Sequence, residues 1–180
     1  MKPEQTTNAA KLGQALIDLS SESLAVQQEG LNRVVDNHLE SPELIEPLAA
    51  IVAARLARGI HDGTAQWAGT LLHQLDGKPE LHALALSESS DPEEARRGLS
   101  VMLFLANALS PVEVDRLKVT ARYHFQNSGE DLKRAAQHAA AGILYRDHRE
   151  SAGNLYDTGL AQAPEPSDFM DRALEFLRAS

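Results

Sequence analysis

The sequence contains no cysteine among its 180 residues. This absence excludes disulfides, thiolate nucleophiles and cysteine-ligated zinc or iron–sulfur sites. Aromatic residues make up only 4% of the chain, so leucine, alanine and valine must form the core, which suits closely packed helices better than a β-sandwich. Basic residues are outnumbered, because 17 Lys and Arg face 26 Asp and Glu for a formal net charge of −9. Such a surface repels nucleic acid and anionic membranes and attracts basic partners.

Long apolar runs are also missing. The longest stretch without charge covers residues 98–112, which are 15 residues, whereas a helix needs about 20 to cross a bilayer. The N-terminal stretch "MKPEQTTNAAKLGQ" lacks the apolar core of a secretion signal. We therefore expect a cytoplasmic protein that does not enter a membrane.

Every periodic segment has helical spacing, and none alternates with a period of two. Proline-led caps at Ser41-Pro42, Asp91-Pro92 and Ser110-Pro111 mark helix starts. The sequence predicts an all-α protein of nine or ten helices in antiparallel pairs. We expect a helical domain over 1–163, followed over 164–180 by a short proline-containing linker and a C-terminal helix that packs on it. Among the helices we expect ranges of about 9–19, 22–39, 64–75, 92–109 and 152–161.

The predicted helix over 92–109 is apolar on every side of a helical wheel, so other parts of the protein must surround it. Leaving one such face in water costs roughly 1.5–3 kcal/mol for each large side chain. Two interpretations remain open. The helix is either the central rod of a compact fold, or one of its faces is a docking surface.

Prolines at 42, 79 and 111 recur at intervals of 37 and 32 residues, each near the start of a helix. This spacing resembles the helix pairs of HEAT and armadillo repeats, over about residues 24–144. The resemblance implies a right-handed α-solenoid. An irregular helical bundle is the alternative, because Ser-Pro and Asp-Pro start helices well in any all-α fold.

The stretch "GIHDG" places His61 and Asp62 between two glycines. With His38 and a later aspartate, Asp115 or Asp131, the order resembles that of HD-domain phosphohydrolases, in which imidazole and carboxylate groups hold a metal that activates water. Gly59 has the place of a residue that ends a helix, and Asp62 is well placed to cap the next one. We interpret the pair as a helix joint, and we keep a metal site of His38, His61 and Asp62 as the alternative.

The region 116–149 carries seven basic and three acidic residues, with Tyr123 and Tyr145 nearby. Nucleic acid binding through this surface is a second alternative. Pairing with acidic neighbours within the chain is the interpretation that we favour.

No HExxH, phosphate loop or Gly-x-Ser-x-Gly elbow is present in the sequence. We therefore predict a non-enzymatic helical module that binds another protein and needs no cofactor. The C-terminal helix is expected to cap the stack or to exchange between two copies in a homodimer. Aromatic and Met side chains anchor interfaces when exposed, which gives the candidate contact residues Trp67, Met102, Phe104, Tyr123, Tyr145, Phe169 and Phe176.

Overall fold

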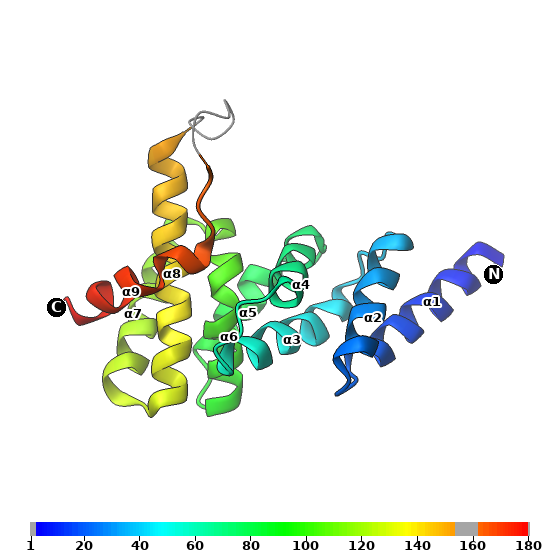
Figure 1. Ribbon diagram of the computed structural model, residues 1–180, viewed down its shortest axis with the longest axis horizontal. Helices are drawn as coiled ribbons and strands as arrows, with labels where there is room; N and C mark the ends of the chain where they lie inside the picture. Colours follow the sequence, from blue (N-terminus) through cyan, green and yellow to red (C-terminus); the bar gives the residue numbers. More distant parts are fainter. Residues whose placement is uncertain (1–2, 154–161, 180) are drawn as a thin grey trace.

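The computed structural model describes residues 3–153 and 162–179, and all regular structure in these two ranges is helical (Figure 1). The predicted all-α class is confirmed. The helices are α1 (Pro3–Leu19), α2 (Leu24–Asp36), α3 (Ile45–Ala57), α4 (Gly63–Gln74), α5 (Pro79–Ser87), α6 (Pro92–Leu105), α7 (Pro111–Asn127), α8 (Glu130–Ala152) and α9 (Met170–Arg178), with 3-10 turns at Pro42–Leu44, Ala106–Ala108 and Pro166–Phe169.

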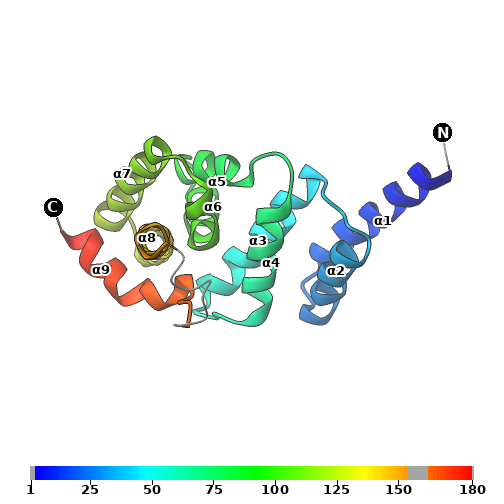
Figure 2. The same cartoon turned by 90° about the horizontal axis from the view of Figure 1, so that it is seen from above.

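Consecutive helices pack as pairs, α1 with α2, α3 with α4, α5 with α6 and α7 with α8. The pairs follow one another along the long axis of the molecule, from the N-terminus at one end to the C-terminus at the other (Figures 1 and 2). The C-terminal helix α9 and the 3-10 turn before it pack mainly on α8. The α1–α2 pair touches the next pair only sparsely, and a hollow of about 700 Å³ lies between the α1–α2 corner and α3.

Helix α6 lies at the centre, in contact with α3, α4, α5 and α8. The five consecutive residues 99–103 are each at most 1% exposed, and at about 100° per residue they cover every side of the helix. Of the two interpretations of this apolar helix, the central rod is therefore confirmed. The sequence predicted that it would continue to residue 109, but it gives way to the 3-10 turn after Leu105.

Two glycines allow the backbones around α6 to come close together. A Cβ added at Gly98 in α6 would overlap the backbone of Ala83 and Ser87 in α5. A Cβ added at Gly142 in α8 would overlap the carbonyl oxygen of Met102 in α6. Alanines at 135, 136, 139, 140 and 141, all buried, give α8 the small surface that this close packing requires.

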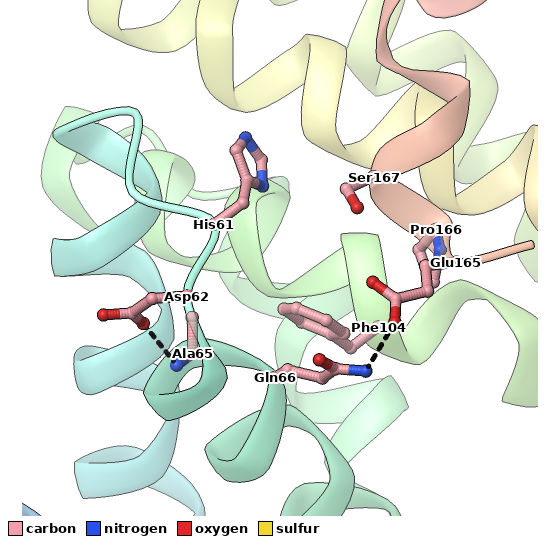
Figure 3. Close-up of a pocket in the computed structure, with 8 residues that line it drawn as sticks. All are labelled: His61, Asp62, Ala65, Gln66, Phe104, Glu165, Pro166 and Ser167. Carbon is pink, nitrogen blue, oxygen red and sulfur yellow. Dashed lines mark hydrogen bonds between the residues drawn. The ribbon is translucent and has the colours of Figure 1, made fainter.

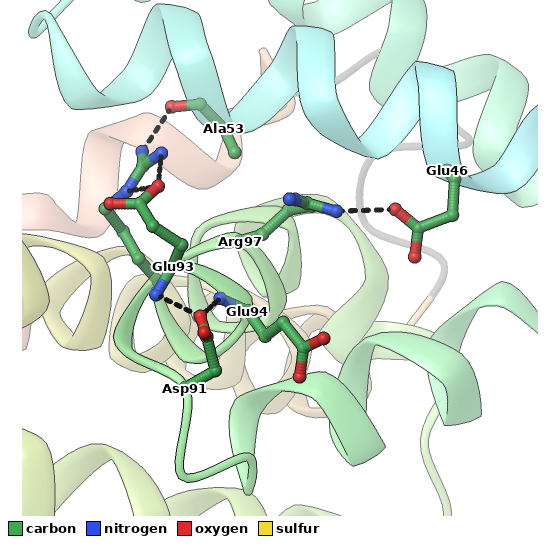
Figure 4. Close-up of polar contacts among 7 residues, drawn as sticks. Glu46, Ala53, Asp91, Glu93, Glu94 and Arg97 are labelled. Carbon is green, nitrogen blue, oxygen red and sulfur yellow. Dashed lines mark hydrogen bonds and ion pairs between the residues drawn. The ribbon is translucent and has the colours of Figure 1, made fainter.

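The predicted caps are present where the sequence placed them. Asp62 accepts a hydrogen bond from the backbone N–H of Ala65, and Ser110 forms a complete capping box with Glu113. Asp91 accepts from the N–H groups of Glu93 and Glu94 (Figure 4). Other boundaries differ, since α1 begins earlier than predicted and α2 is shorter at both ends. Most of the helix predicted over 152–161 lies outside the described residues.

A partly exposed cluster of charged and polar side chains connects three helices. Glu46 of α3 forms an ion pair with Arg97 of α6 at 2.7 Å (Figure 4). The Nε2 atom of His82 in α5 lies at hydrogen-bond distance, 2.5 Å, from the other carboxylate oxygen of Glu46. Partial burial opposes ionisation of Glu46, but the hydrogen bonds from His82 and Arg97 outweigh it, so the pKa of this carboxyl lies below its usual value. The cluster therefore favours the charged form of Glu46 and fixes how α3 lies across the α5–α6 pair.

Within the described part of the chain, none of the helices combines the length and the apolar character that a bilayer-spanning segment needs.

Replacing Gly142 by alanine is expected to destabilise the protein by about 2 kcal/mol or more, because α6 and α8 must separate to admit the methyl group. Gly13 of α1 is the matched control, since a Cβ there meets nothing within 4 Å. Gly13→Ala should raise the free energy of unfolding by about 0.5–1 kcal/mol. Urea denaturation followed by circular dichroism measures both. Equal effects of the two substitutions would contradict the close approach.

Replacing Ser110 by alanine removes the side-chain cap of α7 and should cost about 1 kcal/mol. Ser23 occupies the same position before α2 but makes no side-chain cap hydrogen bond. Ser23→Ala should therefore have a clearly smaller effect in the same denaturation experiment. A larger loss at Ser23 than at Ser110 would show that the capping box does not stabilise α7.

Candidate functional site

The seven candidate contact residues lie in different environments. Met102 and Phe169 are 0% and 5% exposed and belong to the core, so a partner cannot reach them, and the selection by residue type fails for both. Trp67, Phe104, Tyr145 and Phe176 are partly buried against the core. Tyr123 is different, because 60% of it is exposed.

Tyr123 stands on the outer face of α7. The inner face of this helix is buried through Val114, Leu117 and Ala121. On the outer face, Val112 and Val119 are 72% and 71% exposed. Val112, Val119 and Tyr123 are separated by seven and four residues, so they form a stripe along one side of the helix, which Arg116 interrupts between Val112 and Val119. The candidate contact residues were selected as aromatic and Met side chains, so Val112 and Val119 were missed. Their spacing with Tyr123 on one side of the helix is the signal that could have found them.

A groove of about 590 Å³ runs beside this stripe. Val119 and Tyr123 line it from α7, Pro92 and Ala95 from the start of α6, and Leu132 from α8. The loop between α5 and α6 adds Glu88, Ser89 and Ser90, and Thr120, His124 and Ser128 complete the lining on the α7 side. We call this feature the Tyr123 groove. Its volume falls within the ~300–1,000 Å³ typical of binding pockets, and it combines an apolar lining with a polar edge.

The edge of the Tyr123 groove is acidic. Glu88 holds Arg116 in a two-pronged ion pair, with nitrogen–oxygen distances of 2.6 and 3.1 Å, so these charges cancel. Asp91 and Glu94 border the α5–α6 loop, and Asp131 precedes Leu132 of the lining. In the part of the chain that the structure describes, these three carboxylates form no ion pair with a basic side chain. A local excess of negative charge remains at the groove.

The His61-Asp62 pair forms a joint between α3 and α4. Asp62 caps α4 and forms an ion pair with Arg55 of α3, which occupies its carboxylate. His38 lies at the end of α2 in a left-handed conformation, with φ of 49°, and lines a different hollow. No group of three or more His, Asp or Glu side chains in the described residues is arranged to hold a metal ion. The structure does not bring His38, His61 and Asp62 together as ligands.

His61 instead meets His138, a histidine of α8 that is 1% exposed. The two rings pack edge to face with centroids 5.6 Å apart. Burial, with smaller contributions from His61 and Arg134, lowers the pKa of His138 to about 3. Its Nδ1 has no hydrogen-bond partner in the described residues. Partial burial also lowers the pKa of His61, so both imidazoles are held in their neutral forms.

A small pocket opens beside His61 (Figure 3). Ser167 and Glu165 of the C-terminal segment face His61 and Gln66 across it, and Gln66 donates a 3.4 Å hydrogen bond to Glu165. The free volume is about 30 Å³, far below the ~300–1,000 Å³ that is typical of small-molecule pockets. The pocket therefore joins the C-terminal segment to the α3–α4 joint and is too small for an organic substrate.

The basic side chains of 116–149 are largely paired. Ion pairs join Arg116 to Glu88, Lys118 to Asp115, and Lys133 to Glu130, and Arg146 contacts both Asp147 and Glu150. Arg134 donates to the carbonyl of Ala57, and Arg122 lies over the ring of Phe176. This arrangement agrees with internal pairing, which was the favoured interpretation of the region.

No protein-family model matches the chain, and no curated protein or solved structure shows significant similarity to it.

We expect the free energy of unfolding to fall in acid because His138 is buried in its neutral form. Above pH 6.5 the residue is neutral in both the folded and the unfolded chain. Between pH 6.5 and about 3 the unfolded chain binds a proton that the folded chain excludes, so the free energy of unfolding falls as the pH falls. The loss between pH 6 and pH 5 should be about 1 kcal/mol.

The variant His138→Leu replaces the titrating imidazole by an apolar side chain of similar size. Urea denaturation at pH 8, 6 and 5 should show a smaller loss of stability in acid than in the wild-type protein. The value at pH 8 reports the change in packing alone and serves as the internal control. Parallel pH profiles of the two proteins would show that His138 is not excluded from protonation by the fold.

Proposed function

We propose that this protein is a non-enzymatic helical module that binds a segment of another protein in the Tyr123 groove. The observation that carries the proposal is the exposed apolar stripe of Val112, Val119 and Tyr123 beside that groove. Exposed apolar side chains that gather on one face mark interaction sites, whereas isolated ones are common on any surface. Tyrosine is also enriched among the residues that contribute most to interface affinity.

The arrangement of the helices supports a HEAT-like stack as the framework. Helices α4, α6 and α8 pack in series and α5 packs on α7, whereas α3 packs on α6 and the α1–α2 pair contacts the next pair only sparsely. Stacked helix pairs of this kind give extended surfaces that need no reactive residues. In this proposal α6 and α8 form the rigid centre, and α7 presents its outer face to the partner.

Selection from a displayed library of random peptides tests the proposed function without assuming the chemistry of the partner. The double variant Val119→Ser/Tyr123→Ser should keep its stability within about 0.5 kcal/mol, because both residues are exposed. We expect the wild-type protein to enrich peptides that fail to bind this variant.

Ile17→Ser is the matched control, because Ile17 is 67% exposed on α1 at the other end of the molecule. Peptides enriched on the wild-type protein should bind this control with unchanged affinity. Enriched peptides that bind the double variant as well as the wild-type protein would contradict the proposal, and so would a selection that enriches none.

A further inference from the structure

The chemistry of the Tyr123 groove indicates what kind of segment it binds, and this inference rests on the function proposed above. The stripe from Val112 to Tyr123 runs along about three turns of α7, or about 16 Å. Its spacing of seven and four residues is the spacing with which one helix packs on another. The matching surface is an amphipathic helix of similar length, lying along α7 with its apolar side chains over Val119 and Tyr123.

The charges around the groove determine the second property of the partner. Glu94 accepts a 2.6 Å hydrogen bond from the Ser89 hydroxyl, which lines the groove, so this carboxylate is held at the edge. Asp91 is fixed beside it as the cap of α6 (Figure 4). Asp131, in the first turn of α8, directly precedes the lining residue Leu132. Arg116, beside this edge, is already neutralised by Glu88, and Lys133, which follows Leu132, pairs with Glu130.

We propose that the Tyr123 groove binds an amphipathic helix of another protein, whose lysine and arginine side chains flank an apolar face and pair with Asp91, Glu94 and Asp131. Charges of opposite sign around an apolar contact give specificity and speed association. A second copy of this chain fits poorly as the occupant. Each copy carries a net charge of −9 and presents the same acidic edge, so the two repel.

Two designed peptides of about five helical turns test the inference. One repeats leucine and lysine in an amphipathic pattern, and the other has glutamate in place of every lysine. Fluorescence anisotropy of the labelled peptides with the full chain measures binding. We expect the leucine–lysine peptide to bind, and to bind more weakly as salt is added, while the leucine–glutamate peptide does not bind.

Two pairs of variants locate the binding. Val119→Ser/Tyr123→Ser should weaken the leucine–lysine peptide by about tenfold or more, and Ile17→Ser should leave it unchanged. Glu94→Gln/Asp131→Asn should weaken it by about threefold or more at low salt. The control Asp36→Asn/Glu40→Gln removes the same charge from exposed acids near α2, at the far end of the molecule, and should have little effect.

Each contrary result has a distinct meaning. Equal weakening by the two acidic pairs, or binding of the leucine–glutamate peptide in the groove, would overturn the basic partner and leave the groove as a binding site. Binding that ignores Val119 and Tyr123 would overturn the placement of the helix along α7. A dimer in sedimentation equilibrium that Val119→Ser/Tyr123→Ser dissociates would assign the groove to a second copy and overturn the inference.

Discussion

The close approach of three helix backbones at α6 is the constraint on which the rest of the structure depends. Gly98 lets α6 lie against the backbone of α5, and Gly142 lets α8 lie against the Met102 carbonyl. Dispersion forces fall steeply with distance, so two helices without intervening side chains gain many contacts that a wider gap would lose. Few aromatics are needed in such a core, which agrees with their 4% share of the sequence. Leucine and alanine fill the narrow spaces that remain.

This packing also decides which surface is left for a partner. The face of α7 that carries Val114, Leu117 and Ala121 is used to cover the core, while α9 covers α8 from the side beyond it. The outward face of α7 thus has no further helix of the described chain over Val119 and Tyr123, which are 71% and 60% exposed. The polar residues near them serve other purposes locally, as Asp91 does when it caps α6. Because a capping side chain is held by its hydrogen bonds, Asp91 would present a rigidly placed charge to the proposed partner helix.

Much of the fold could be predicted from the sequence because its signals are local. Proline after Ser110 or Asp91 predicts where a helix begins, and apolar residues on every side of the helix predicted over 92–109 indicate that other parts of the protein surround it. The site was harder to predict, since the residue type of Met102 or Phe169 does not say which side of its helix meets solvent. The contact between His61 and His138 joins residues far apart in the sequence, and no periodicity encodes it. Helix ends such as Leu105 also depend on tertiary packing, because the apolar pattern continues past them.

The sparse contact between the α1–α2 pair and the remainder has a consequence for how the protein loses its structure. A large hollow separates that pair from α3, whereas α6 is enclosed by four helices. Opening the N-terminal end exposes little apolar area, but exposing α6 requires that most of the molecule come apart. Proteins commonly open in cooperative units of unequal stability. We therefore expect the α1–α2 pair to open at a lower free-energy cost than the helices around α6, which also hold the outer face of α7.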